Sequence, residues 1–588
     1  MGFLSLFAAF FLIELIAFSF LKPERLLSLS FGALWAGLFA CIALVLPRLA
    51  GRILFGILYF SAFLWALAQV GYYIFFGKMM WLSTVAYAGE GAAYFSDVLA
   101  RFPFLWWLGL AFMLALGVLV IIKFPKVQKP VVRRLPYMGI SALLLIGLCL
   151  LPLSLKSNTA YAGMFNAKEV YDSTGLYQLT FRDLLVNELH FQRKDTADDR
   201  VTDFFAQRTD AESNEMTGMY EGKNVILVLM ESMDDWMITY QDTPTIKRMM
   251  KEGISFTNFY TPGYGTARTL NSEFCMNTGI YLPTTGSDLF DYMDNSFDQS
   301  IASQLSKNGY NSKVFHYNNP QYYKRYILEP AIGYEEYIAY SNYTSDKSQL
   351  CRDTILFEIP EIKAEFFRDG TRFNTIITRS AHLGYTYNEI IGSYALKQYP
   401  EYIGLYGSEE ENCARVKAKM VDDMFKRLLQ ELEDRGELEN TVIIAMSDHY
   451  TYGYKNMEEL YSHSKVDSAL LLEKVPCFIW AADKPGIKVE KTLNTADLVP
   501  TVLNILGIDS PYDYLGQDAF DPNYKGYALF PDGSWICDGV AWQDGSILMN
   551  TNDRAVTQEE IDGMAKLSEQ YRAVSNLLLS TDYYRKVS

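Results

Sequence analysis

The sequence predicts two unlike parts: a membrane domain of five transmembrane helices, and an α/β domain with a mainly parallel central sheet and a small antiparallel piece near its C-terminus. Three observations carry this prediction. Five long apolar segments occupy the first quarter of the 588 residues, short apolar runs alternate with helical patterns after residue 223, and reactive polar residues end those runs. With 50% hydrophobic residues, the chain can supply both a membrane part and a separate soluble core.

Each of the five apolar segments has about the length needed to cross a bilayer. They span roughly 3–21, 26–46, 53–76, 105–122 and 137–154. Lys and Arg gather in the loop after the fourth segment, and Arg48 and Arg52 lie between the second and third. Because basic loops stay inside, the N-terminus is expected in the cytoplasm and everything after about residue 155 outside the cell membrane. The aromatic connection 78–104 is then expected to face outward, as short helices in the headgroup zone.

These patterns divide the chain into a membrane domain at 1–154, a linker at 155–222 and an extracellular domain at 223–588. Apolar residues recur at helical spacing in 175–186, so the linker is expected to contain one amphipathic helix. The net charge of -16 argues against a nucleic-acid partner, whose phosphates require clustered Lys and Arg. The seven cysteines show no zinc spacing.

From Lys223 onward, short buried runs alternate with helices, which is typical of an α/β domain. The runs expected to form strands are 225–230, 312–316, 374–378, 441–446 and 475–480. The clearest helix covers 414–435, where apolar residues recur every four positions and Gly436 stops the pattern. Turn signals within 515–550 predict the antiparallel piece.

A glycine-containing stretch, Gly263 to Phe274, follows the apolar run 254–260. Its glycines permit a tight turn that would place Arg268 and Thr269 at the start of a helix. Unpaired N–H groups at a helix N-terminus favour anions, and the arginine adds a positive charge. Two interpretations stay open from this stretch alone: Thr269 is an ordinary N-cap, or its hydroxyl attacks a bound phosphate.

Reactive side chains stand at the ends of several predicted strands, where ligands collect in open α/β sheets. Glu231, His316, His382 and the pair Asp448-His449 each end or follow one. Each could instead be structural, since an acid in this position often caps the next helix. Two carboxylates and an imidazole converging near a threonine hydroxyl would, however, form a site for a divalent ion. Such an ion would activate a hydroxyl that is otherwise a poor nucleophile.

Together, the motifs resemble those of the lipoteichoic acid synthases and related phosphoglycerol transferases of the alkaline-phosphatase and sulfatase superfamily. The matching segments are Lys223–Ser232, Gly265–Phe274 and Ser447–Tyr450. The resemblance implies a sulfatase-like fold, with Thr269 as nucleophile and a divalent cation, manganese or another such as Mg²⁺. It implies the metal ligands Glu231, Thr269, Asp448 and His449. It implies substrate contacts at Arg268, His316, Tyr323, Arg325 and His382.

The function that this resemblance implies is membrane-bound lipoteichoic acid synthesis, a part of cell wall biogenesis. Glycerol phosphate would pass from phosphatidylglycerol through a covalent threonine intermediate to a glycolipid or polyglycerophosphate acceptor, releasing diacylglycerol. Two positions depart from the family pattern: Arg268 replaces a lysine, and Tyr323 replaces a tryptophan. A phosphoethanolamine transferase and a catalytically inactive membrane scaffold or sensor remain alternatives. A true sulfatase is not expected, because a C/S-x-P-x-R motif is missing.

Overall fold

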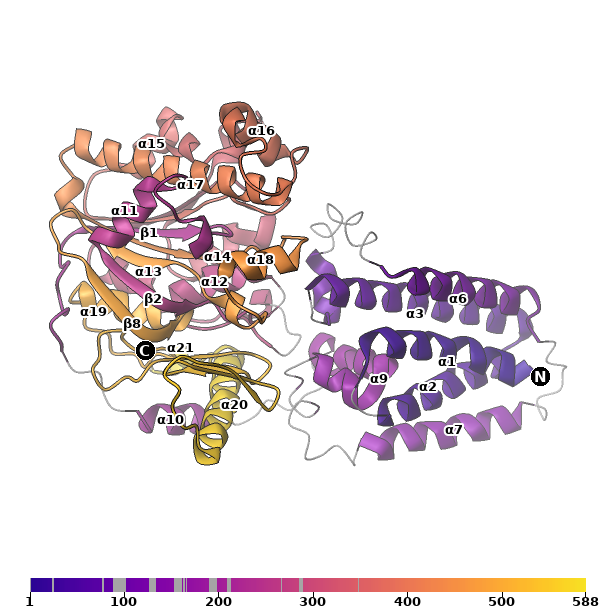
Figure 1. Cartoon of the computed structure of the whole chain (residues 1–588). Coiled ribbons are helices and arrows are strands. Elements are labelled where there is room, and N and C mark those ends of the chain that lie inside the picture. The colour runs from indigo at the N-terminus through magenta and orange to yellow at the C-terminus, as the bar shows by residue number, and fades with distance from the viewer. Residues whose placement is uncertain are drawn as a thin grey trace. The chain divides into compact units, whose positions relative to one another are not determined.

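The computed structural model describes residues 2–23, 26–76, 79–87, 102–125, 134–152, 161, 164, 167–189, 198–208, 213–265, 267–284, 289–346 and 348–587. The chain forms two compact units, one built mainly from Met1–Asp195 and the other mainly from Thr196–Ser588 (Figure 1). Most of the aromatic connection predicted to lie at the membrane surface falls outside the described residues.

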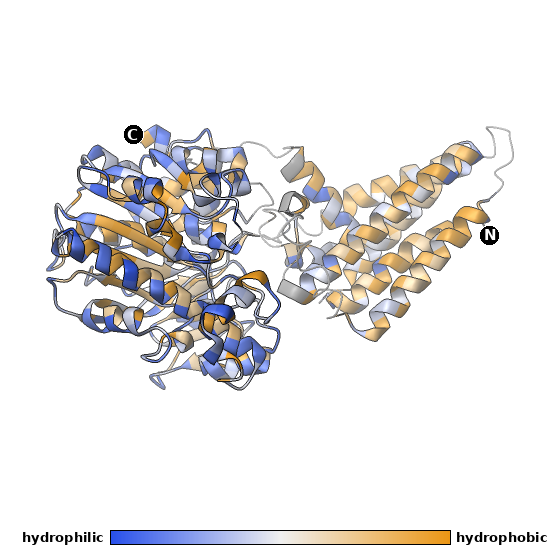
Figure 2. Ribbon diagram, turned by 90° about the horizontal axis from the view of Figure 1, so that it is seen from above, coloured by the Kyte–Doolittle hydropathy of each residue, from blue (hydrophilic) through white to orange (hydrophobic). Residues whose placement is uncertain are grey.

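The first unit is a bundle of apolar helices, and the predicted spans are confirmed as helices. Its long helices are α1 (Gly2–Leu21), α2 (Leu27–Val45), α3 (Arg48–Phe76), α6 (Phe104–Ile122), α7 (Leu135–Leu150) and α9 (Ala167–Asp183). Four of them, α1, α2, α3 and α6, are long and apolar enough to cross a membrane, whereas α7 is apolar but only 16 residues long. Hydrophobic residues dominate these helices (Figure 2).

Helix α9 contains most of the amphipathic segment predicted at 175–186, and it packs against α1 and α2 within the first unit. The helix is broken at Gly175, where φ is 76° and ψ is 178°. The break frees the N–H group of Leu176, which donates to Glu14 Oε1 at 2.7 Å. Three further bonds join α9 to α1, α2 and α3: Tyr177 Oη donates to the Phe10 carbonyl, Trp35 Nε1 donates to Gln178, and Trp65 Nε1 donates to Thr180. The break at Gly175 thus lets a buried carboxylate of α1 bind the start of a helix.

The second unit is an α/β domain with two sheets. The larger sheet contains β1 (Asn224–Met230), β2 (Ile254–Tyr260), β3 (Asn311–His316), β4 (Glu336–Ala339), β5 (Arg372–Ile377), β6 (Thr441–Ser447), β7 (Cys477–Trp480) and β8 (Ile487–Asn494). The smaller contains β9 (Tyr527–Leu529), β10 (Trp535–Cys537), β11 (Val540–Gln543) and β12 (Ser546–Asn550). The helices are α10 (Asp198–Ala206), α11 (Pro244–Glu252), α12 (Arg268–Thr278), α13 (Ile301–Lys307), α14 (Arg325–Ala331), α15 (Pro360–Phe366), α16 (Ile390–Gln398), α17 (Glu409–Asp434), α18 (Met457–Ser464), α19 (Leu498–Ile505), α20 (Gln558–Ser580) and α21 (Tyr583–Val587).

The larger sheet has the strand order β4-β3-β5-β1-β6-β7-β2-β8 and is mainly parallel, as predicted. Only β7 runs against its neighbours, pairing antiparallel with both β6 and β2. Strand β1 is buried along its whole length between its parallel partners β5 and β6. Because these strands run the same way, the residues that follow β1, β3, β5 and β6 all leave the sheet at one edge.

Helices cover both faces of this sheet, which explains why its central strands are continuously apolar. One face of β1 packs in a core that includes Phe274 of α12, Ile301 of α13 and Val499 of α19. Helices α11, α15 and α17 lie on the other side (Figure 1). Helix α17 starts five residues before the predicted helix because Ser408 Oγ accepts the N–H of Glu411 as an N-cap. The antiparallel sheet β9 to β12 confirms the piece expected within 515–550.

Candidate functional site

Three of the predicted metal ligands meet at the carboxyl ends of β1 and β6. Met230 lies opposite Ser447 in the parallel register, so Glu231 and Asp448 leave the sheet side by side. Glu231, Asp448 and His449 each offer a ligand atom, and these atoms lie within 4.8 Å of one another. All three residues are buried. The sheet therefore builds this cluster from its two central strands.

Short-range hydrogen bonds orient the two carboxylates. Ser232 has φ of 52°, a left-handed conformation that lets its N–H donate to Asp448 Oδ1 at 2.8 Å. Its hydroxyl donates to Glu231 Oε1 at 2.7 Å, and the His449 N–H donates to Asp448 Oδ1 at 2.9 Å. The second oxygen, Asp448 Oδ2, is buried and has no hydrogen-bond partner among the described residues, although His449 Nε2 lies 3.0 Å away. This oxygen is left open to a cation.

The imidazole of His449 is oriented in the same direction. Its Nδ1 lies 2.9 Å from the carbonyl oxygen of Tyr450, so Nδ1 carries the donated proton and Nε2 faces the cluster. The same Nε2 lies 3.7 Å from Glu231 Oε1 and 3.4 Å from Thr269 Oγ1. Carboxylate oxygens and an imidazole nitrogen therefore converge on one point beside the threonine hydroxyl.

The electrostatics of the cluster favour a bound cation. Burial, together with the neighbouring Asp448 charge, raises the pKa of Glu231 to about 8. The pKa of His449 is raised as well: burial opposes this, but the adjacent Asp448 and Glu231 outweigh it. Two buried carboxylates held beside an imidazole are a donor set that a divalent cation fits. The described residues thus offer a site that a divalent cation fits.

Thr269 occupies the second position of α12, which excludes the N-cap interpretation and leaves its role as nucleophile a prediction. The N-cap position belongs to Ala267, and no side chain there accepts a helix N–H. Thr269 Oγ1 instead faces His449 at 3.4 Å. Gly265 has φ of 62°, and a β-carbon there would lie 2.7 Å from that of Leu282, so the turn before the helix requires glycine. Ser272 of α12 donates its hydroxyl to the Asp448 carbonyl, which joins the helix to the end of β6.

Arg268 lies beside the predicted nucleophile but is already paired. Its Nη1 donates to both carboxylate oxygens of Glu473, at 2.7 and 2.6 Å. Glu473 ends the short helix η13 (Leu471–Glu473). The guanidinium also lies over the rings of Tyr450 and Tyr452, at 5.2 and 5.8 Å. The positive charge predicted to face a phosphate is therefore balanced by a partner that the sequence did not suggest.

Arg325 is held by the helix that carries Thr269. It is 1% exposed, and it binds Glu273 through two parallel bonds, Nε to Oε1 at 2.8 Å and Nη2 to Oε2 at 2.6 Å. Glu273 stands one helical turn after Thr269. The remaining nitrogen, Nη1, is buried without a hydrogen-bond partner among the described residues. Tyr323 has φ of 49°, and its ring lies 5.0 Å from the guanidinium. Arg325 thus keeps one donor available in a fixed orientation.

The two predicted substrate histidines are neutral at physiological pH. Burial and the charge of Arg325 hold the pKa of His316 well below its usual range, and its Nδ1 lies 2.7 Å from the Ile377 carbonyl oxygen. Burial, followed by the charges of Arg379 and Lys417, lowers the pKa of His382 to about 4. Either imidazole can therefore accept a proton or bind a hydroxyl.

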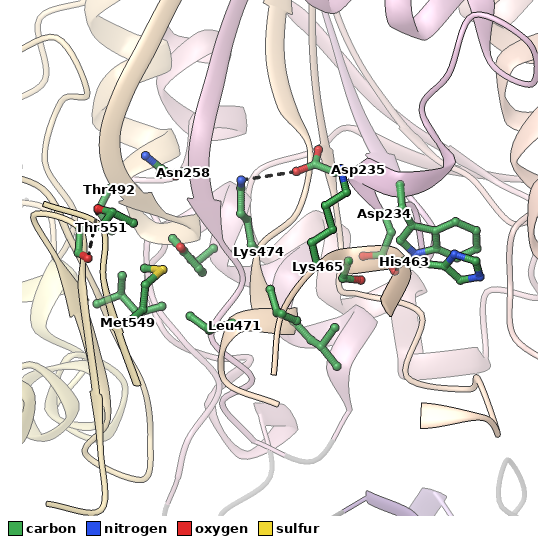
Figure 3. Close-up of a pocket in the computed structure, with 17 residues that line it drawn as sticks. Asp234, Asp235, Asn258, His463, Lys465, Leu471, Lys474, Thr492, Met549 and Thr551 are labelled. Carbon is green, nitrogen blue, oxygen red and sulfur yellow. Dashed lines mark hydrogen bonds and ion pairs between the residues drawn. The ribbon is translucent and has the colours of Figure 1, made fainter. Parts of the chain in front are cut away.

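A second group of metal-type ligands, Glu411, Glu459 and His463, lies between α17 and α18. Its carboxylates already have partners: Arg415 donates to Glu411, and Ser408 donates to Glu459. Nearby lies a pocket of about 500 Å³, whose lining includes Asp235 and Lys474 (Figure 3). Trp236 stacks on His463 at its edge. None of the predicted site residues lines this pocket.

The sequence of this chain was compared with protein families and with known proteins. Residues 223–508 match the family model described as Sulfatase. The chain is 26% identical over 416 residues to lipoteichoic acid synthase 2 of Bacillus subtilis (strain 168), an alignment covering 66% of this chain and 62% of that protein. It is 23% identical over 450 residues to lipoteichoic acid synthase of Staphylococcus aureus (strain NCTC 8325 / PS 47), an alignment covering 72% of this chain and 67% of that protein. The aligned region thus spans less than two thirds of the Bacillus protein.

A solved structure supports the same fold. The crystal structure of the lipoteichoic acid synthase LtaP from Listeria monocytogenes superposes with a TM-score of 0.52 at 19% identity. The match covers 64% of this chain and 98% of that one. At this identity the likeness concerns the fold alone, and it confirms the sulfatase-like α/β architecture.

Proposed function

From the premise that this chain contains a sulfatase-family domain of the alkaline phosphatase superfamily and is related to the lipoteichoic acid synthases, we propose that it is a membrane-bound phosphoglycerol transferase. The proposed donor is phosphatidylglycerol. The proposed acceptor is a glycolipid or a polyglycerophosphate chain. The observation that carries this proposal is the meeting of the Thr269 hydroxyl with a buried, oriented set of carboxylate and imidazole ligands.

The proposed location follows the charges of the membrane loops. The N-terminus lies in the cytoplasm, and the second unit lies outside the cell, where lipoteichoic acid is made. A lipid donor suits this arrangement, because its diacylglycerol part stays in the bilayer while its headgroup is accessible to an enzyme anchored there.

The reaction would begin with attack of Thr269 Oγ on the phosphorus of phosphatidylglycerol. A phosphorus–oxygen bond to Thr269 forms, the bond to the diacylglycerol oxygen breaks, and that oxygen takes up a proton as diacylglycerol leaves. A divalent cation, manganese or magnesium, held by Glu231, Thr269, Asp448 and His449 would lower the pKa of the threonine hydroxyl when bound. The product of this half-reaction is glycerophosphate linked to Thr269.

In the second half-reaction, a terminal hydroxyl of the acceptor attacks the same phosphorus. The bond to Thr269 Oγ breaks, the acceptor hydroxyl loses its proton, and the threonine hydroxyl is restored. His316 and His382, both neutral, are the candidates for holding the glycerol or carrying these protons. Arg325 Nη1 is a candidate for binding a phosphoryl oxygen, because Glu273 fixes the guanidinium and leaves that nitrogen without a partner among the described residues. Arg268 is occupied by Glu473.

Diacylglycerol release tests this proposal. The full-length protein, supplied with manganese, is expected to release diacylglycerol from vesicles containing phosphatidylglycerol, and Thr269→Ala is expected to abolish the release. Release from phosphatidylethanolamine instead would identify a phosphoethanolamine transferase. Equal release by Thr269→Ala, or no release from either lipid with bound metal, would contradict a transferase mechanism at Thr269.

A further inference from the structure

Helix α17 contributes a fully buried lysine whose role the sequence did not suggest. The side chain of Lys417 has no solvent exposure. Its Nζ donates to the carbonyl oxygen of His382 at 2.9 Å, to the carbonyl oxygen of Gly384 at 2.9 Å and to Glu389 Oε2 at 2.8 Å. An ammonium group has three N–H donors, so all its donors are used. Two of them bind the backbone of the turn that carries His382.

The same turn is held at its other end by a buried carboxylate. Asp353 Oδ1 accepts the N–H of Arg379 at 2.8 Å, and its Oδ2 accepts the N–H of Ser380 at 3.0 Å. A negative side chain therefore binds two backbone donors before His382, and a positive one binds two backbone acceptors from His382 onward. Bonds to charged groups are the stronger kind, and the imidazole itself is held more loosely: its Nδ1 lies 3.3 Å from the Leu383 carbonyl oxygen.

We propose that Lys417 is a positioning residue for the substrate-binding role of His382. This inference rests on the proposed function, in which His382 contacts the glycerophosphate headgroup. By binding the two carbonyl oxygens on either side of Leu383, the lysine fixes the backbone from which the imidazole projects. A misplacement of about 1 Å in a substrate-positioning group can reduce turnover roughly 100-fold. Fixing the backbone of this turn with a buried ammonium group would therefore serve catalysis.

The cost of burying Lys417 supports a specific role. Burial lowers its pKa, and Glu389 offsets this by pairing with it. Glu389 also caps α16, accepting the N–H groups of Ile391 and Gly392 at 2.9 Å each. A buried pair of charges is weak evidence of stabilisation, because two well-packed apolar side chains would often serve as well. An apolar pair, however, could not bind the carbonyl oxygens of the His382 turn.

The test compares Lys417→Met with a matched variant of the same helix, Lys419→Met. Lys419 also pairs with a carboxylate, Asp423 at 3.0 Å, but it lies nearer the surface. Because it follows Lys417 by two residues, it projects from a different side of α17. Phosphatidylglycerol turnover by the full-length protein is measured together with metal affinity and thermal midpoint. Lys417→Met is expected to lower kcat/KM by about 10- to 100-fold without changing metal affinity, and Lys419→Met by less than about twofold.

A double-mutant cycle with His382→Ala separates positioning from general damage. If Lys417 acts through His382, Lys417→Met should have no further effect, within about twofold, once His382 is removed. Multiplied losses in the double variant, or a Lys417→Met enzyme as active as the wild type, would overturn the inference.

Should Lys417→Met fail to fold, Glu389→Gln replaces it in the same cycle, because the amide keeps an acceptor for α16 while removing the charge that holds the ammonium. Its loss of turnover must likewise vanish in the His382→Ala background. Full wild-type turnover by Glu389→Gln, or multiplied losses, would overturn the inference. A His382→Ala variant with normal turnover would also overturn the inference, because Lys417 could then not act through His382. A wild-type protein that releases no diacylglycerol would instead contradict the proposed function.

Discussion

The two units of the chain place buried carboxylates in different surroundings. In the first unit, Glu14 of α1 accepts the N–H of Leu176 at the break in α9, so its charge meets the positive end of a helix. In the second unit, Glu231 and Asp448 face each other and His449, and Asp448 Oδ2 has no hydrogen-bond partner among the described residues. Glu14 Oε2, like Asp448 Oδ2, has no hydrogen-bond partner among the described residues, so the two arrangements differ in their ligand groups: one carboxylate at Glu14, and two carboxylates with an imidazole in the cluster. A buried acid indicates a metal site only where further ligand groups converge on it.

The strongest test of this comparison removes one open carboxylate. Asp448→Asn is expected to lower both metal affinity and diacylglycerol release by more than about 100-fold, since ligand loss exceeds the cost of changing a supporting residue. Metal-free stability should change little, because the amide oxygen of the substituted side chain can still accept the N–H of Ser232. Isothermal titration with manganese and thermal unfolding measure the two effects.

Asp422→Asn is the matched control. Asp422 is equally buried, but it lies on helix α17 outside the cluster and accepts the Ile246 N–H at 2.7 Å. It should leave metal affinity unchanged. Undiminished manganese binding by Asp448→Asn would show that the cation does not bind at the Glu231, Asp448 and His449 cluster.

A second test uses pH on the metal-free protein. The pKa of Glu231 is raised from 4.5 to about 8 by burial and Asp448, so the folded state binds the proton more tightly than the unfolded state. Its contribution to stability is complete below pH 4.5 and is lost as pH rises to about 8, by up to about 1.4 kcal/mol per pH unit. The difference between wild type and Glu231→Gln in unfolding free energy should therefore change across this window, with the wild type losing stability relative to the variant as pH rises. A constant difference would contradict the shared burial of the two acids.

A third test removes the carboxylate of the first unit, Glu14. Glu14→Leu leaves the Leu176 N–H buried without its acceptor, which should destabilise the membrane unit by about 1–3 kcal/mol. Glu14→Gln keeps an acceptor oxygen and should cost less. Thermal unfolding in detergent measures both variants, and manganese affinity should not change in either. A loss of metal binding in Glu14→Leu would show that the two carboxylate arrangements are not independent.

The smallest expected effect concerns a third arrangement, in which Glu473 is paired with Arg268. Glu473→Gln removes the negative charge, so Arg268 should attract anions more strongly beside Thr269. Inhibition of diacylglycerol release by inorganic phosphate is expected to strengthen by about two- to fivefold, in keeping with about 0.5–1 kcal/mol for a partly screened pair. Weaker inhibition would mean that Glu473 helps rather than opposes anion binding.

The sequence could predict the parts of this molecule that follow from local pattern. The length of the apolar segments indicated the membrane spans, and unbroken apolar runs indicated β1 and β6. Because Glu231 and Asp448 follow those two parallel strands, they could be expected at the same edge of the sheet. The interpretation of Thr269 as a simple N-cap was wrong, because the cap position falls on Ala267.

What the sequence could not predict are pairings between distant segments. Arg325 meets Glu273 from 52 residues away, and Lys417 meets the His382 carbonyl from 35 residues away. Neither pair has a characteristic spacing, and only the sheet topology brings them together. The Glu14 contact with Leu176, 162 residues apart, further depends on a helix break at a single glycine. Charge alone did not distinguish these supporting residues from surface ones.

Covalent labelling tests whether the carboxylate cluster serves Thr269 as a nucleophile. The full-length protein is incubated with manganese and phosphatidylglycerol labelled in its headgroup, without acceptor, and its peptides are analysed by mass spectrometry. We expect glycerophosphate on Thr269 of the wild type, none on Thr269 of Asp448→Asn, and release of the label when acceptor is added. Diacylglycerol formation with no label on Thr269, or label on another residue, would contradict this role of Thr269.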